Sequence, residues 1–148
     1  MKASEWTPTT RKVFFGIATA VLILSLLSCA TKATFLTSNV VPAARGTVTV
    51  KDDKNNNYVI KLKIANLAEA ERLPQAGSTY VVWMETGENT VRNLGAMKSS
   101  AGFMSKNLTA SFQTVTSIKP TKIFITAENN AAIQYPSETV LSTDRFNN

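Results

Sequence analysis

The amino-acid sequence predicts an all-β fold, an antiparallel β-sandwich of about seven strands. Three observations support this prediction. After residue 46, apolar and polar residues alternate in several segments, which is typical of strands with one buried side. Turn-forming residues separate these segments at intervals of about ten residues. No alternation of strands with helices of about 10–15 residues is visible, which argues against a parallel α/β fold. A small β-barrel is the alternative.

The chain of 148 residues suits one folded domain, and its 44% apolar content is enough for a core. We expect a signal helix, a flexible tether, the β-sandwich and a frayed C-terminus. Their predicted ranges are 1–28, 29–45, 46–142 and 143–148.

An apolar run from Val13 to Leu27 follows the basic pair Arg11 and Lys12. A positive segment before an apolar run of this length is typical of a secretory signal, which we expect to form a helix. The alternative is an uncleaved transmembrane helix over 13–30, near the lower length limit for a membrane span. In both cases Arg11 and Lys12 stay in the cytoplasm and the rest crosses the membrane.

The run ends in Leu26-Leu27-Ser28-Cys29, which contains the only cysteine of the chain. This motif resembles the lipobox of bacterial lipoproteins. The resemblance implies that the Cys29 thiol receives a diacylglycerol and that a peptidase cleaves between Ser28 and Cys29. A thiolate is nucleophilic enough for this lipidation, and two or more acyl chains anchor a protein stably. Ala30 follows instead of aspartate, which resembles lipoproteins exported to the outer membrane, facing the periplasm or the cell surface.

Residues 31–45 are rich in threonine, serine and alanine and show no clear period. We therefore expect them to be a flexible tether, spanning on the order of 20 Å.

The first two predicted strands, 46–53 and 58–65, form a hairpin. Valines alternate in the first strand, and in the second Ile60, Leu62 and Ile64 alternate with Lys61 and Lys63. We interpret the two lysines as a solvated strand face, because nucleic-acid binders concentrate their basic residues more strongly. The Asp- and Asn-rich segment between the strands lacks the glycine and distant glutamate of a calcium loop, so we expect a turn.

Further along, 67–73 is expected to form one or two helical turns, ended by Pro74. In the strand predicted over 91–98, Gly95 marks a bulge or a close approach of the backbone. The other predicted strands cover 79–86, 107–114, 122–128 and 137–143.

Tyr80-Val-Val-Trp83 followed by Asn93-Leu-Gly95 resembles the extracytoplasmic domain of anti-sigma-K-type factors. Thr-Ala-Glu at 126–128 and Pro136 extend the resemblance, which covers 46–142. It implies a β-sandwich. Members of that family carry a cytoplasmic domain before the membrane segment, whereas only twelve residues precede the apolar run here, so a sigma-binding function is not carried over.

The chain has no histidine and one cysteine, which excludes His-based catalysis, most zinc sites and an intramolecular disulfide. We expect no metal and no cofactor. Tyr80 and Trp83 differ by an odd number and therefore lie on opposite strand faces, but they are candidates for a binding surface. Glu85, Glu88 and Glu128 are the candidate acids, although their spacing defines no catalytic pair.

These observations predict a lipid-anchored bacterial envelope protein whose β-sandwich is a non-catalytic binding or assembly module. The alternative is a membrane-linked regulatory or sensing domain derived from anti-sigma factors. The expected partners are membrane lipid, through acylated Cys29, and an unidentified envelope protein or glycan, with no nucleic acid.

Overall fold

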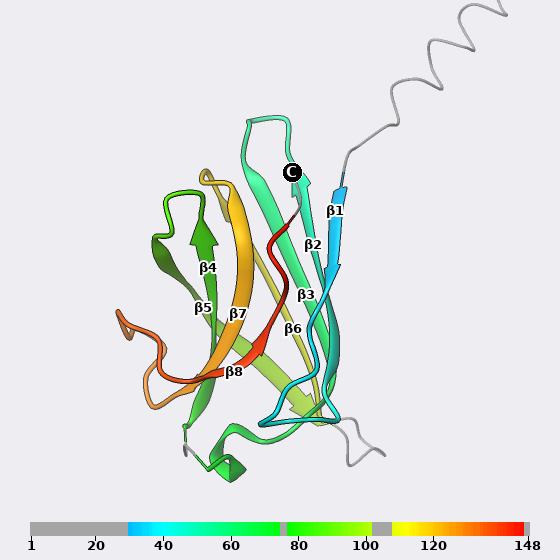
Figure 1. Ribbon diagram of the computed structural model, residues 1–148, viewed down its shortest axis with the longest axis vertical. Helices are drawn as coiled ribbons and strands as arrows, with labels where there is room; N and C mark the ends of the chain where they lie inside the picture. Colours follow the sequence, from blue (N-terminus) through cyan, green and yellow to red (C-terminus); the bar gives the residue numbers. More distant parts are fainter. Residues whose placement is uncertain (1–29, 75–76, 102–107, 147–148) are drawn as a thin grey trace, which may run out of the picture.

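The computed structural model describes residues 30–74, 77–101 and 108–146, with side chains for all of these except 98–101. Within these ranges the secondary structure is almost entirely antiparallel β-strand, as Figure 1 shows. The strands are β1 (Ala30–Thr34), β2 (Arg45–Asp52), β3 (Tyr58–Leu67), β4 (Thr79–Thr86), β5 (Val91–Ala101), β6 (Leu108–Thr116), β7 (Pro120–Glu128) and β8 (Thr139–Ser142).

Two antiparallel sheets of four strands face each other, so the predicted β-sandwich is confirmed. We call β1-β2-β3-β6 the first sheet and β5-β4-β7-β8 the second sheet. Strand β5 joins them, because 91–97 pairs with β4 whereas 98–101 pairs with β6. The eight strands thus form one hydrogen-bonded path.

A second seam joins the opposite edges of the two sheets. Phe35, just after β1, forms an isolated bridge with Thr143, just after β8. The N–H of Leu36 also donates to the carbonyl of Ser142, at 2.8 Å. Figure 1 shows the blue start and the red end of the described chain side by side here. The two sheets are therefore hydrogen-bonded to each other along both edges, as the strands of a barrel would be.

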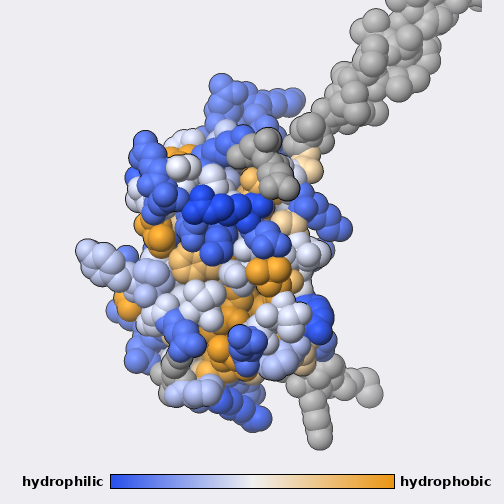
Figure 2. Space-filling model, in the orientation of Figure 1, coloured by the Kyte–Doolittle hydropathy of each residue, from blue (hydrophilic) through white to orange (hydrophobic). Residues whose placement is uncertain are grey.

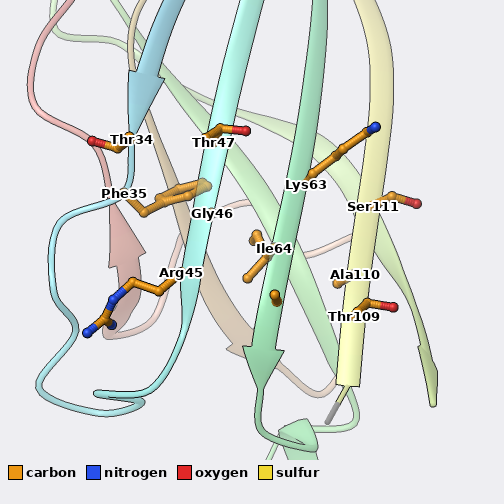
Figure 3. Close-up of a pocket in the computed structure, with 11 residues that line it drawn as sticks. Thr34, Phe35, Arg45, Gly46, Thr47, Lys63, Ile64, Thr109, Ala110 and Ser111 are labelled. Atoms are coloured by element: carbon orange, nitrogen blue, oxygen red, sulfur yellow. The ribbon is translucent and has the colours of Figure 1, made fainter. Parts of the chain in front are cut away.

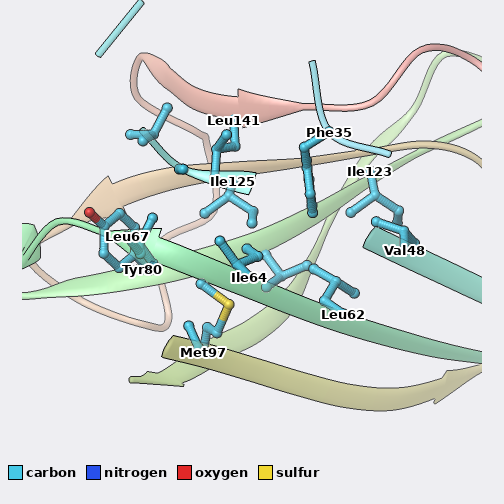
Figure 4. Close-up of a cluster of buried hydrophobic side chains, with 14 of the residues drawn as sticks. Phe35, Val48, Leu62, Ile64, Leu67, Tyr80, Met97, Ile123, Ile125 and Leu141 are labelled. Carbon is cyan, nitrogen blue, oxygen red and sulfur yellow. The ribbon is translucent and has the colours of Figure 1, made fainter. Parts of the chain in front are cut away.

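The core lies between the sheets and follows the predicted alternation. Val48, Ile60 and Leu62 of the first sheet are at most 1% exposed, as are Ile123 and Ile125 of the second. Figure 4 shows side chains from both sheets converging, among them Leu62 of the first sheet and Ile123 and Ile125 of the second. The lysines between them point to solvent, so the prediction for the β2–β3 hairpin is confirmed.

Residues 30–45 are not a flexible tether, so that prediction is wrong. Residues 30–34 form β1, which pairs with β2 from Ala30↔Lys51 to Thr34↔Thr47. Phe35, Val41 and Ala44 then enter the core. The hydroxyl of buried Ser38 donates to the carbonyl of Val140 and accepts the N–H of Val41. Residues 35–44 lack a period because they form a loop that packs on the core.

Gly46 makes room for Phe35. A Cβ at this position would lie 2.8 Å from Cγ1 of Ile64 and 3.0 Å from Cδ2 of Phe35, so any larger residue would displace one of them. The absence of a side chain at Gly46 therefore allows the ring of Phe35 to pack against β2.

The C-terminal end is also packed, which corrects the prediction of fraying from residue 143. Thr143 is 1% exposed and its N–H donates to Ile123, while the N–H of Phe146 donates to Thr121. Only 147–148 lie outside the described residues.

The connections largely follow the sequence prediction. In the β2–β3 turn, the Asp53 carboxylate accepts the N–H groups of Asn57 and Asn55, and these hydrogen bonds lower its pKa. In β5 the register skips Leu94 beside Gly95, whose φ of +124° favours glycine, so the predicted bulge is confirmed. The helical turn over 67–73 is shorter than predicted, a 3₁₀ turn over Ala70–Arg72.

The signal segment, the lipobox and Cys29 lie outside the described residues, so their predictions stand as made. Among the residues with described structure, no helix has the length and apolarity needed to cross a bilayer.

Figure 2 shows one side of the surface, where hydrophobic residues gather in the middle and lower part of the view. The exposed large apolar side chains among the described residues come from separate segments: Leu36, Val91, Val115 and Tyr135. Apolar exposure by itself therefore marks no single site.

Replacing Phe35 with alanine is expected to lower the free energy of unfolding by about 3–5 kcal/mol, because it leaves a cavity between the sheets. The measurement is urea unfolding of the purified protein. Leu36→Ala is the matched control, since Leu36 is 46% exposed, and it should cost about 0.5 kcal/mol or less. An unchanged free energy of unfolding in Phe35→Ala would contradict the packing of residues 30–45 on the core.

Candidate binding surface

Tyr80 and Trp83 do not form an exposed aromatic platform, so the structure overturns their candidacy as a binding surface. Tyr80 is 3% and Trp83 0% exposed. Their predicted placement on opposite faces of β4 is confirmed, because Tyr80 joins the core between the sheets and Trp83 a second cluster. Burial raises the pKa of Tyr80 to about 12, and its hydroxyl donates to the carbonyl of Ala68 at 3.0 Å.

Trp83 is buried because the connection between β7 and β8 covers the outer face of the second sheet. Its ring stacks on Phe124, with centroids 6.2 Å apart, and Ile133 of the connection packs on this cluster. The side-chain amide of Asn93 holds the connection in place by donating to the carbonyls of Ala131 and Ile133.

A buried polar chain runs beneath the same connection. The indole N–H of Trp83 donates to the hydroxyl of Thr126 at 2.8 Å, and Thr126 in turn hydrogen-bonds Glu128. The Glu128 carboxylate also accepts the N–H and the hydroxyl of Ser137, at 2.8 and 2.7 Å. Burial favours the neutral acid, but the hydrogen bonds from Thr126 and Ser137 outweigh it and lower the pKa of Glu128.

The candidate acids do not converge. Glu85 pairs with Lys122 in the β4–β7 ladder and makes ion pairs with Lys122 and Arg145, at 3.4 and 3.1 Å. Glu128 pairs with Thr79 at the other end of the same ladder, which places it about 20 Å from Glu85 along the strands. Glu88 lies in the β4–β5 turn, at the Glu85 end. Glu85 and Glu128 are thus too far apart for a glycosidase pair.

The larger feature is the outer face of the first sheet, which we call the cationic face. Its basic residues are Lys32, Arg45, Lys51, Lys61 and Lys63. The other outward positions of these strands carry small, hydroxyl or amide side chains with two valines, namely Ala30, Thr34, Thr47, Thr49, Val59, Ala65, Thr109, Ser111, Gln113 and Val115. None of these outward positions carries a carboxylate.

The register aligns these residues in rows across the strands. Lys32 of β1, Thr49 of β2 and Lys61 of β3 form one row. In the next row Lys63 stands between Thr47 and Ser111, as Figure 3 shows. Lys61 and Lys63 are therefore about 7 Å apart along β3.

Three hollows line up on this face, with volumes of about 610, 420 and 660 Å³. Lys63 lines the first and second, and Lys61 the second and third, so the two lysines are the ridges between them. Arg45 stands at the first hollow, where its guanidinium donates to the carbonyls of Pro42 and Ala44. The small neighbours leave the backbone accessible between these long side chains.

Carboxylates approach this surface at two of its borders: Asp52 and Asp53 line the third hollow at the hairpin end, and Asp144 lines a further hollow with Lys32 and Thr34. The Asp53 carboxylate is held by the turn, as described above. Among the described residues, no carboxylate makes an ion pair with Lys32, Lys51, Lys61 or Lys63. The positive charges of the face are therefore not neutralised within that part of the chain.

The alternating pattern of the sequence places three basic residues of this face on a solvated strand side, namely Lys51, Lys61 and Lys63. Lys61 and Lys63 were expected to be solvated, but Lys32 and Arg45 lay in the supposed tether, and pairing with β1 and β2 was needed to assemble the set. Thr126 and Ser137 also went unnoticed. The Thr-x-Glu spacing, which places Thr126 and Glu128 on one strand face, was the available signal for the first of them.

The chain was compared with protein families, curated proteins and solved structures. No known protein family matches the chain, and no curated protein or solved structure is significantly similar to it. The resemblances to bacterial lipoproteins and to anti-sigma-K-type domains stay predictions from the sequence.

Glu128→Gln is expected to lower the free energy of unfolding at neutral pH by about 1–3 kcal/mol, because it replaces the charged acceptor of buried hydrogen bonds. The folded-state pKa lies below the ordinary value of 4.5, so the carboxylate stabilises the fold above that pH. Its contribution is lost as pH falls through the folded-state pKa. The difference between wild type and variant in urea unfolding should therefore shrink from about pH 6 to about pH 3.

The control is Glu138→Gln, at an exposed position near the start of β8, which should leave the unfolding curve unchanged. A difference for Glu128→Gln that stays constant over this pH range would contradict the role of the carboxylate charge.

Proposed function

We propose that this protein is a lipid-anchored protein of the bacterial cell envelope whose β-sandwich is a non-catalytic binding module. The observation that carries the proposal is the motif Leu26-Leu27-Ser28-Cys29 at the end of an apolar run that follows two basic residues. Acylation of Cys29 would supply the membrane anchor.

The position of β1 supports a close connection between anchor and domain. Ala30, the residue after Cys29, is already paired with Lys51. One residue spans at most about 3.6 Å, so the lipid-bearing residue adjoins the first sheet without an intervening linker. In this arrangement the sandwich rests at the bilayer surface.

Two observations support a binding role: the interactions of the acidic residues Glu85 and Glu128, and the open surface of the cationic face. Glu85 and Glu128 are committed to ion pairs and to buried hydrogen bonds, respectively. Among the described residues, no cluster of candidate ligands is placed to hold a metal ion. The cationic face, with its hollows, is the broad surface that remains free for a partner.

The anchor is tested by metabolic labelling with a palmitate analogue in a bacterial host, followed by purification of the protein. We expect labelled wild type, with Cys29 as its first residue, and an unlabelled Cys29→Ser variant, because the serine hydroxyl does not accept the lipid. Ser28→Ala is the matched control and should stay labelled, since alanine is also small.

An unlabelled wild type that retains its initiating methionine would overturn the proposal. Label that persists in Cys29→Ser would show that the lipid is attached elsewhere, and would overturn the assignment of the anchor to this residue.

A further inference from the structure

The cationic face begins at the point where the described chain begins. Ala30 stands opposite Lys51 in the β1–β2 register, and Lys32 is the next outward residue of β1. Neighbouring strands are about 4.8 Å apart and alternate residues about 7 Å apart. Both lysines therefore lie within about one Debye length, ~8 Å at physiological salt, of the residue that follows Cys29.

The rest of the face extends away from this corner in one sheet. Lys61 lies two strands from Lys32 in the same row, and Lys63 follows in the next row. A twisted but open sheet face of this kind presents its basic side chains to one side of the molecule, with threonine and serine hydroxyls between them.

The second sheet offers no comparable surface. Its outer face is covered by the β7–β8 connection, held by Asn93, above the buried Trp83 cluster. Of the basic residues in the strands of this sheet, Lys122 is paired with Glu85, whereas Arg92 of β5 is exposed. Arg145, which follows β8, is also paired with Glu85. Most of the basic residues within the described strands thus lie on the sheet whose first residue follows Cys29, against Lys122 and Arg92 on the second sheet.

We propose that the cationic face docks flat on an anionic lipid surface, with Lys61 and Lys63 among the headgroup phosphates. The proposal rests on the lipid anchor proposed above, because the anchor holds this face at the bilayer. Basic residues near a membrane surface are attracted by its negative potential, and a basic patch next to an acyl anchor is a recognised second membrane signal.

Charge and anchoring together favour lipid over a soluble acidic partner. The hollows on either side of the lysine ridges are open to solvent and adjoin one another, and the threonine and serine hydroxyls of the face can donate to phosphate groups there. The anchor presents the face to headgroups at high effective concentration, whereas a soluble partner must compete with them.

The test uses the full chain, purified with its anchor and placed in nanodiscs of phosphatidylcholine alone or with about one third phosphatidylglycerol. A water-soluble acetylating reagent and mass spectrometry report the accessibility of each lysine. In the anionic discs, labelling of Lys61 and Lys63 should fall by about threefold or more. Lys119, exposed in the β6–β7 connection, should be labelled equally in both discs.

Variants with fewer positive charges test whether the lysines of the cationic face cause the protection. In the double variant Lys61→Gln/Lys63→Gln, the protection of Lys32 and Lys51 by anionic lipid should weaken, because the face loses its central charges. The matched control Arg92→Gln/Lys119→Gln removes the same charge from β5 in the second sheet and from the β6–β7 connection, and it should keep the protection. Raising the salt concentration should reduce the protection in wild type.

Equal labelling of Lys61 and Lys63 in the two discs would overturn the docking proposal. So would protection concentrated at Lys54 and Lys119, which would mean that the molecule stands on its hairpin end.

The mass of the N-terminal peptide, measured in the same sample, separates this proposal from the proposed function. An unmodified Cys29 overturns the anchor whatever the lysines show. A lipidated Cys29 with uniform lysine labelling overturns the docking alone.

Discussion

The packing of Phe35 over Gly46 is the contact on which the rest of the structure depends. It brings the segment after β1 onto the core, and the adjacent bridge to Thr143 then ties the free edge of the first sheet to that of the second. Ser38 strengthens this seam from the loop by donating to Val140. Strand β5 is shared by the two sheets at the opposite edge. The two sheets are therefore linked along both edges, and the core is covered on these sides as well.

The sequence predicted the strands well where one face is buried and the other is solvated. The β2–β3 hairpin is such a case, because Ile60 and Leu62 alternate with lysines and the pattern has one interpretation. The segment 30–45 has no such alternation. Its burial depends on Gly46 and on partners over 90 residues away, such as Val140, so local patterning carried no sign of it.

The candidate site was less predictable than the fold. The parity of Tyr80 and Trp83 correctly separated them onto two faces, but an outward aromatic was expected to be exposed, and the β7–β8 connection covers it. Burial on both sides makes β4 and β7 nearly continuous in apolar character, which Ile123-Phe124-Ile125 already displayed. The cationic face, in turn, is a property of strand register, since Lys32, Lys51 and Lys61 are distant in sequence and share one sheet face only through strand pairing.

The direction of β1 also has a mechanical consequence. A pull on the chain ahead of Ala30, directed along the strand, acts on the whole β1–β2 ladder from Ala30↔Lys51 to Thr34↔Thr47 in shear. The hydrogen bonds of that ladder then share the load and must yield together, whereas a peeling force would break them one at a time. Behind the ladder, the ring of Phe35 acts as a stop against sliding, because it is wedged above Gly46 and Ile64. The strand is thus oriented to resist a pull applied at its N-terminal end.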